Sequence, residues 1–89
     1  MNMHAKDFEN FLSLRISQLR HQKGVSAREM SLAIGQSENY ISRIESKRML
    51  PSMLVFFYIC EYFGIHPKEF FDEKLENPGI SKELMEKFQ

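Results

Sequence analysis

Apolar residues along the chain recur every three or four positions, which is the spacing of one face of an α-helix, and no stretch alternates as a half-buried strand does. In the first helix, expected from about residue 7 to residue 22, one apolar stripe is formed by Phe8, Leu12, Ile16 and Leu19. Gly24 is placed to end this helix, because glycine readily adopts the left-handed conformation found at helix C-termini. The pattern predicts an all-α protein.

Two short helices are expected next. Glu29 follows Ser26 at the spacing of a capping box, which predicts a helix start at Ser26 and an end before Gly35. Ser37 is predicted to cap the third helix. The apolar face of that helix consists of Ile41 and Ile44. Since no other face of it is apolar, the polar remainder is expected to point outward.

Residues 51–63 predict a fourth helix, started by Ser52 and ended by Gly64. A fifth helix is expected after His66, with Pro67 at its first position. Both predictions depend on local effects: the Ser52 hydroxyl can accept a backbone N–H, Gly64 tolerates the left-handed conformation, and Pro67 has a ring that suits a first helical position.

Length and composition favour one compact domain, because a chain of 89 residues buries too little surface for two cores. We expect residues 1–11 to extend the first helix, residues 12–73 to form the domain, and residues 74–89 to form a tail that can include a short helix. The longest apolar run has eight residues, far fewer than the ~20 that span a bilayer, and no secretory signal is visible. The single cysteine, Cys60, fits a reducing cytoplasm.

The chain has no net charge, but its charges are segregated. Residues 15–50 contain seven Lys or Arg and three Glu, a net charge of +4. Residues 51–89 contain four Lys and seven acidic residues, a net charge of −3. We expect the basic segment to present a positive face toward phosphate and the acidic segment to face away from it.

Two short helices joined by a turn at Gly35, the second polar on its outer face, are typical of a helix-turn-helix. The segments KGVSAREMSLAIGQSENYISRIES and PSMLVFFYICEYFGIHPKEFF resemble the helix-turn-helix family of phage Cro and lambda-type repressors (XRE-like proteins), from Leu12 to about Asp72. The resemblance implies a compact five-helix, lambda-repressor-like domain that binds double-stranded DNA. It also implies a bacterial or phage transcriptional regulator, expected to be a repressor that occupies a near-palindromic operator as a homodimer.

In this family the N-terminal part of the third helix enters the major groove, where short polar side chains meet base edges. The base contacts that the resemblance implies are Glu38, Asn39, Ser42 and Arg43. The implied phosphate contacts are Arg28, Gln36, Ser37, Tyr40, Lys47 and Arg48. Glu38 also has a purely structural interpretation, since an acidic residue stabilises the first turn of a helix.

Two other positions bear on the implied interface. Arg20 and Glu45 match family positions that pair between the first helix and the end of the third, which implies a structural ion pair. Ala27 stands where the family often has a Gln that contacts phosphate. Either Arg28 replaces that contact or the register on DNA differs.

The fourth helix is apolar on nearly every side and has one charged residue, Glu61. The core residues that the family resemblance implies for it are Met53, Phe56, Ile59, Cys60 and Phe63. Four more side chains need cover, namely Leu54, Phe57, Tyr58 and Tyr62. The segment from Phe8 to Phe11 or the tail residues Leu84, Met85 and Phe88 can supply it, but we expect a homodimer interface, because a two-fold partner also matches operator symmetry.

Enzymatic and metal-dependent functions have little support in the sequence. The three histidines lie on different elements without partners at ligand spacing, no nucleotide-binding glycine loop occurs, and no base is evident for Cys60. We therefore expect no catalysis, metal, cofactor or small-molecule effector. Two alternatives to a repressor remain: an antitoxin that binds a toxin and represses its own operon, and a protein-interaction module that has lost DNA binding.

Overall fold

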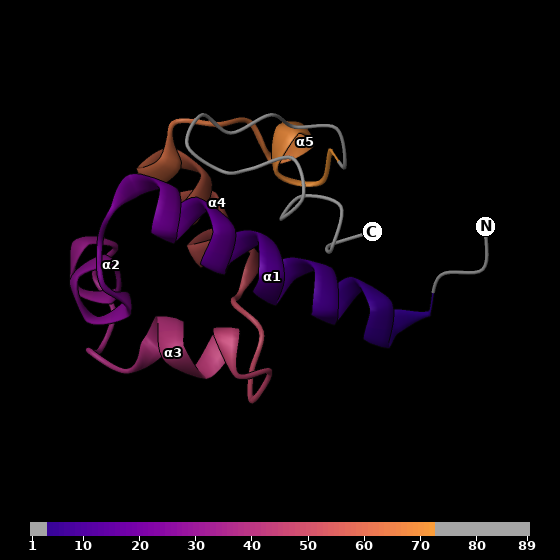
Figure 1. Cartoon of the computed structure of the whole chain (residues 1–89), viewed down its shortest axis with the longest axis horizontal. Helices are drawn as coiled ribbons and strands as arrows, with labels where there is room; N and C mark the ends of the chain where they lie inside the picture. Colours follow the sequence, from indigo (N-terminus) through magenta and orange to yellow (C-terminus); the bar gives the residue numbers. More distant parts are fainter. Residues whose placement is uncertain (1–3, 73–89) are drawn as a thin grey trace.

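The computed structural model describes residues 4–72, and five helices make up this part of the chain (Figure 1). They are α1 (Ala5–Lys23), α2 (Ala27–Ala33), α3 (Tyr40–Glu45), α4 (Met53–Phe63) and α5 (Pro67–Phe70). Residues 4–72 contain no strand, so the predicted all-α, five-helix fold is confirmed. The predicted tail helix, with Leu84, Met85 and Phe88, lies outside the described residues.

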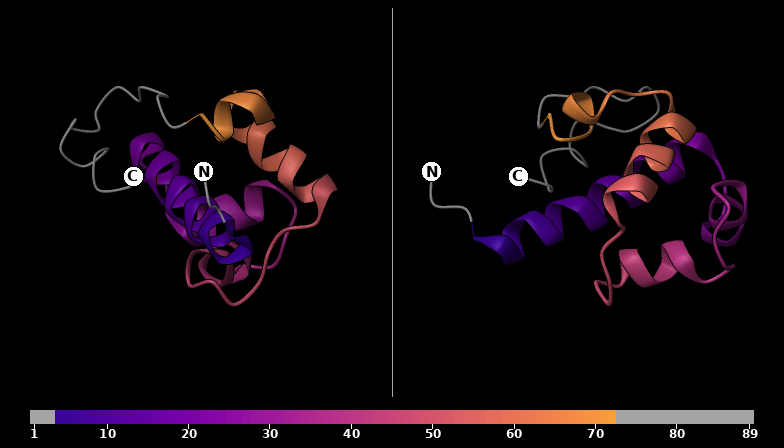
Figure 2. Two further views of the ribbon diagram at one scale, coloured as in Figure 1. Left: turned by 90° about the vertical axis from the view of Figure 1, so that its right-hand side faces the viewer. Right: turned by 180° about the vertical axis from the view of Figure 1, so that it is seen from behind.

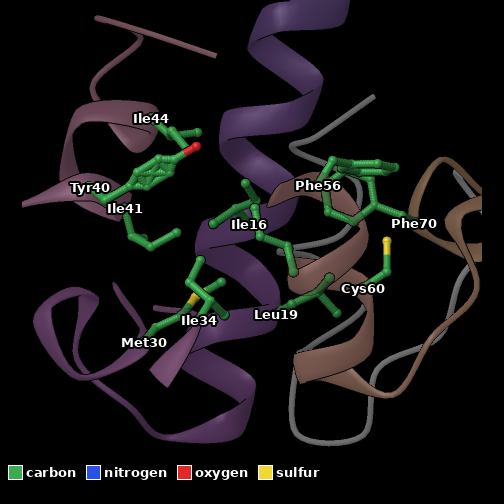
Figure 3. Packing of buried hydrophobic residues seen from close by; sticks show 11 residues of the cluster. Ile16, Leu19, Met30, Ile34, Tyr40, Ile41, Ile44, Phe56, Cys60 and Phe70 are labelled. Carbon is green, nitrogen blue, oxygen red and sulfur yellow. The ribbon is translucent and has the colours of Figure 1, made fainter. Parts of the chain in front are cut away.

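The long helix α1 passes through the middle of the domain, with α2 and α3 on one side and α4 and α5 on the other (Figure 3). Its first turns extend beyond the other helices, and it continues without a break across residues 11 and 12 (Figure 2). Phe8 lies in these first turns and is 52 % exposed, so its predicted place on a buried stripe is wrong. None of the helices within residues 4–72 has the length and apolar character needed to cross a membrane.

Helix boundaries follow the capping residues that the sequence contains. The Ser26 hydroxyl accepts the Glu29 backbone N–H (3.0 Å) at the start of α2, and the Ser52 hydroxyl accepts the Val55 N–H (3.2 Å) at the start of α4. Helices α1 and α4 both end at a glycine in the left-handed conformation. These starts and stops agree with the predictions.

The core lies between α1 and the helices on its two sides (Figure 3). Its buried apolar side chains are Ile16, Leu19, Met30, Ile34, Tyr40, Ile41, Ile44, Phe56, Ile59, Cys60 and Phe70. Phe56 and Phe70 meet edge to face with ring centroids 5.1 Å apart, which joins α4 to α5. Burial raises the pKa of the Cys60 thiol, as expected for a small buried hydrophobe. Met53 is 66 % exposed, so its predicted core position is wrong.

A buried arginine fastens α1 to the end of α5. Arg15 is buried, donates from Nη2 to the Asp72 carbonyl oxygen (2.7 Å), and lies over the Phe11 ring at 5.1 Å from its centroid. The Phe11 ring in turn stacks on that of Phe71, with centroids 6.2 Å apart. Arg15 belongs to the basic segment of the sequence, yet its charge is used inside the fold.

Candidate nucleic-acid interface

Helix α3 has one buried and one exposed face. Tyr40, Ile41 and Ile44 point toward α1 and are at most 7 % exposed (Figure 3). Ser42 and Arg43, on the other side, are exposed. The short helix is therefore held by three apolar side chains and leaves its polar side chains on the surface.

The start of α3 differs from the prediction. The helix begins at Tyr40 with Asn39 as its N-cap, two residues later than a cap at Ser37 would place it, so that predicted cap is wrong. The amide that needs a partner in the first turn is satisfied from α2 instead, because the buried Ser31 hydroxyl accepts the Ile41 N–H at 2.9 Å. The same hydroxyl donates to the Ala27 carbonyl oxygen at 2.7 Å. Ser31 thus fixes α3 against α2.

The four predicted base-contacting residues lie together on the surface. Glu38 and Asn39 are in the turn before α3, Ser42 and Arg43 are within it, and all four are exposed. The Arg43 N–H donates to the Asn39 carbonyl oxygen at 3.1 Å, so these two residues are one helical turn apart on one face. Glu38 directly precedes the N-cap Asn39, so it lies just outside the first turn of α3, where its structural interpretation placed it.

Glu38 pairs with Arg28 of α2. Arg28 Nε donates to Glu38 Oε2 at 3.1 Å, and the two side chains are 68 % and 57 % exposed. The family resemblance implied separate roles for these residues, one at phosphate and one at a base, and their contact was not predicted. The two residues are ten apart along the chain, so only the fold brings them together.

The loop after α3 carries two exposed cations, Lys47 and Arg48. Lys47 has φ 64°, the left-handed region, where a residue with a Cβ atom is strained. The Lys47 N–H donates to the Ile44 carbonyl oxygen at 3.0 Å and the Arg48 N–H to that of Arg43 at 2.9 Å, so the loop closes the end of the helix. Glu9 of α1 lines a shallow hollow together with both cations.

An ion pair fixes the C-terminal end of α3 to α1. Arg20 donates two hydrogen bonds to Glu45, from Nε to Oε2 (2.7 Å) and from Nη2 to Oε1 (3.0 Å), and a third from Nη1 to the Val25 carbonyl oxygen (3.0 Å). The two side chains are only 14 % and 16 % exposed. The hydrogen bond to Glu45 raises the pKa of Arg20. The pairing that the resemblance implied is thus present, with no part of it on the exposed face.

The other predicted phosphate contacts lie in three different environments. Ser37 is exposed. Gln36 is half-buried and donates to the Ile34 carbonyl oxygen at 3.3 Å. The Tyr40 ring belongs to the core, and for this reason Tyr40 is not among the phosphate contacts proposed below. Burial raises the pKa of its phenol, and a hydrogen bond with the Ser52 backbone opposes that rise. Ala27 packs against the core.

The basic segment is less positive at its surface than its sequence indicates. Of its seven basic residues, Arg15 is buried and Arg20 is paired with Glu45, whereas Lys23 is exposed, with its ammonium 4.6 Å from the centroid of the Tyr62 ring. The remaining cations are exposed on α2, α3 and the loop after it, and they are Arg28, Arg43, Lys47 and Arg48. Within residues 4–72, no three His, Cys, Asp or Glu side chains form a cluster suited to a metal ion.

A second exposed surface is apolar, and we call it the α4 outer face. It consists of Met53, Leu54, Phe57 and Tyr58, whose exposures are 66, 58, 48 and 40 %. Three residues of the predicted dimer interface, Leu54, Phe57 and Tyr58, belong to it, whereas Tyr62 is half-buried beside Lys23. Apolar side chains gathered on one face are typical of an interaction surface.

The order of the helices, the polar outer side of α3 and the cations beside it agree with the match of the chain to a family model. The model is described as a helix-turn-helix domain and matches residues 14–76. No curated protein and no solved structure gives a significant match. The chain belongs to the helix-turn-helix domain family, a Cro/XRE-type family of DNA-binding regulators.

Proposed function

We propose that this protein is a sequence-specific transcriptional repressor that binds a near-palindromic operator as a homodimer. The observation that supports the proposal best is the exposed polar side of α3, bordered by Lys47 and Arg48 and held on its buried side by the Arg20–Glu45 pair. A short helix fixed in this way can enter the major groove as a rigid body, without the cost of ordering it on binding.

The proposed contacts divide into base readers and phosphate anchors. Asn39 and Arg43 share one face one helical turn apart, and their side-chain types suit adenine and guanine. Ser42 and Glu38 are neighbouring base readers in this proposal. Lys47 and Arg48 lie beyond the helix and are proposed to bind the DNA backbone, together with Arg28, Ser37 and Gln36.

The homodimer is proposed to form through the α4 outer face. An exposed apolar surface on a small domain is covered most simply by a second copy, which also supplies the second recognition helix that a palindrome needs. Repression then follows from steric occlusion of a promoter that contains the operator.

Selection of bound duplexes from a random DNA pool tests this function. We expect the wild-type protein to recover two inverted half-sites separated by about one helical turn, or a multiple of it, from centre to centre. Placing the recovered duplex in a promoter is expected to lower transcription from it. Failure to bind any duplex at low salt would leave the protein-interaction module as the better explanation.

Substitutions then separate readers from anchors. Asn39→Ala and Arg43→Ala are each expected to cost ~1–3 kcal/mol of binding free energy on the recovered duplex and to relax preference at particular base pairs. Lys47→Ala and Arg48→Ala are expected to weaken binding to all sequences alike. They should also reduce the salt slope, the steepness with which the logarithm of the binding constant falls with the logarithm of the salt concentration, by about one for each phosphate that is no longer neutralised. The same sequence-independent loss for Asn39→Ala and Lys47→Ala would contradict the assignment of α3 as the reading helix.

Sedimentation of the protein at micromolar concentration tests the dimer. A monomeric protein would contradict the proposed dimer, and the α4 outer face would then be expected to bind a different protein. A toxin encoded beside this chain is then the first partner to examine, because an antitoxin combines such a surface with DNA binding.

A further inference from the structure

The exposed ion pair between Arg28 and Glu38 contributes little to the stability of the fold. Both side chains are more than half exposed, and pairs of this kind are screened by water and salt. The pair nevertheless connects α2 to the turn that leads into α3, at the edge of the proposed groove-binding surface. Its position therefore suggests a role on DNA, which the fold itself does not require.

A carboxylate at this edge is unfavourable by itself, because DNA phosphates repel it. The guanidinium of Arg28 offsets that repulsion, and one of its five N–H donors is engaged by Glu38. The bond from Nε fixes the direction of the carboxylate and leaves the donors of the two terminal nitrogens available. Removal of water on DNA binding strengthens the attraction between the two charges, since the local dielectric constant falls.

We propose that Arg28 and Glu38 act as one reading unit, in which Arg28 holds the Glu38 carboxylate against a cytosine amino group and binds a phosphate with its remaining donors. The inference rests on the proposed DNA binding. A carboxylate only accepts hydrogen bonds, and in the major groove the cytosine N4 amino group is a donor that suits it. Arg28 is thus a positioning residue for the base contact as well as a phosphate anchor.

The test uses the wild-type protein and a duplex that it recovers from a random pool. Binding of Glu38→Gln, Arg28→Lys and Arg28→Ala is titrated against that duplex and all its single-base variants at several salt concentrations. Glu29→Gln is the matched control, because it removes the same charge from an exposed residue of α2. The Glu29 carboxylate raises the pKa of Tyr62 in α4, so it lies near α4. Thermal unfolding of each variant is measured alongside.

Glu38→Gln is expected to change the preferred base at one position of each half-site from cytosine to adenine, since a glutamine amide both donates and accepts. Arg28→Lys keeps the charge but loses the Nε bond, so the salt slope is expected to stay while discrimination at that same position falls roughly tenfold. Arg28→Ala is expected to lower both the discrimination and the salt slope. Glu29→Gln should leave both unchanged.

Full discrimination by Arg28→Lys at the position read by Glu38 would overturn the paired reading. An equal weakening of all sequences by Glu38→Gln would overturn it too, as would a loss of discrimination that follows a comparable loss of thermal stability. In each of these cases the wild type still selects an operator and the proposed function stands. A wild type that binds no duplex would refute the function and the paired reading together.

Discussion

Helices α3 and α4 bury similar stripes and expose opposite chemistry. Helix α3 buries Tyr40, Ile41 and Ile44 and exposes hydroxyl and charged side chains. Helix α4 buries Phe56, Ile59 and Cys60 and exposes the apolar side chains of the α4 outer face. A polar exposed side is stable in water without a partner, whereas exposed apolar area gains about 25 cal/mol for each Å² that a partner covers. The two surfaces are thus suited to different partners, DNA for α3 and a protein surface for α4.

The two helices also differ in how they are held. Polar contacts fix α3 at both ends, Ser31 at its start and the Arg20–Glu45 pair at its end. Helix α4 is held by its own capping residues and by aromatic packing such as that of Phe56 on Phe70. Directional bonds fix the orientation of a short helix better than apolar contacts do, because they depend on geometry as well as distance. Orientation is what a reading helix needs.

The largest expected effect comes from placing a charge on the α4 outer face. Phe57→Glu is expected to convert the proposed dimer to a monomer and to weaken operator binding on the order of a thousandfold, since two linked half-sites bind far more tightly than one. Because Phe57 is 48 % exposed, the fold should persist. Sedimentation and operator titration measure both effects. Leu32→Glu is the control, as it puts the same charge on an equally exposed apolar residue of α2, and a similar loss there would contradict the assignment of the interface.

Arg20→Ala tests the other side of the comparison, the polar attachment of α3. Its loss leaves Glu45 largely buried without its partner, which is expected to cost about 3 kcal/mol of unfolding free energy and to lower the melting temperature by roughly 12–24 °C. The proposed self-association through α4 should persist at temperatures where the variant is folded, and base preference should be retained. Arg28→Ala is the matched control, because its ion pair is mostly exposed, and it should cost less than about 1 kcal/mol. Equal losses would show that burial does not decide the contribution of these pairs.

Ser31→Ala separates the start of α3 from its end. The Ile41 N–H then has no hydroxyl to accept its bond in a buried site, which is expected to cost about 1–3 kcal/mol of unfolding free energy. Because the contact orients the proposed reading helix, discrimination between operator variants should fall as well. Ser46→Ala removes an exposed hydroxyl that donates to the Arg43 carbonyl oxygen, and it serves as the control with little effect expected. Unchanged unfolding of Ser31→Ala would mean that water replaces the hydroxyl.

The sequence predicted the features that depend on one or two neighbouring residues. Serines at helix starts, Pro67 at the first position of α5 and glycines at helix ends act through local backbone geometry, so α2, α4 and α5 begin and α1 and α4 end near the predicted positions. The pair of Arg20 with Glu45 was accessible only through resemblance to the family. Helical periodicity indicated the buried stripe of α3, because its core residues recur there with the period of a helix turn.

Contacts between elements were not predictable in the same way. Ser31 is an ordinary polar residue in the sequence, and its role at Ile41 depends on how α2 and α3 meet. The pair of Arg28 with Glu38 has the same origin. Periodicity placed Phe8 in the core and the family resemblance placed Met53 there, yet Phe8 lies where α1 extends past its neighbours and Met53 lies where α4 begins at the surface. A repeat of three or four residues shows which side of a helix is apolar. It does not show over how much of its length neighbouring helices pack against that side.

The smallest expected effect has opposite signs for stability and binding. Lys47 occupies the left-handed region at φ 64°, a conformation that glycine adopts without strain. Lys47→Gly is therefore expected to raise the unfolding free energy by about 0.5–1 kcal/mol, the net of relieved strain and a more flexible unfolded chain.

If Lys47 anchors a phosphate, the same change should weaken binding to every duplex and reduce the salt slope by about one for each half-site. Arg48→Gly is the control, since it removes an equal charge from the next residue without a positive φ, and it should weaken binding without any gain in stability. Thermal unfolding and salt-dependent titration of both variants measure the two signs separately. A stabilised Lys47→Gly protein that binds DNA as tightly as the wild type would mean that the strained lysine is not kept for its charge, and Arg48 would then be the anchor at the end of α3.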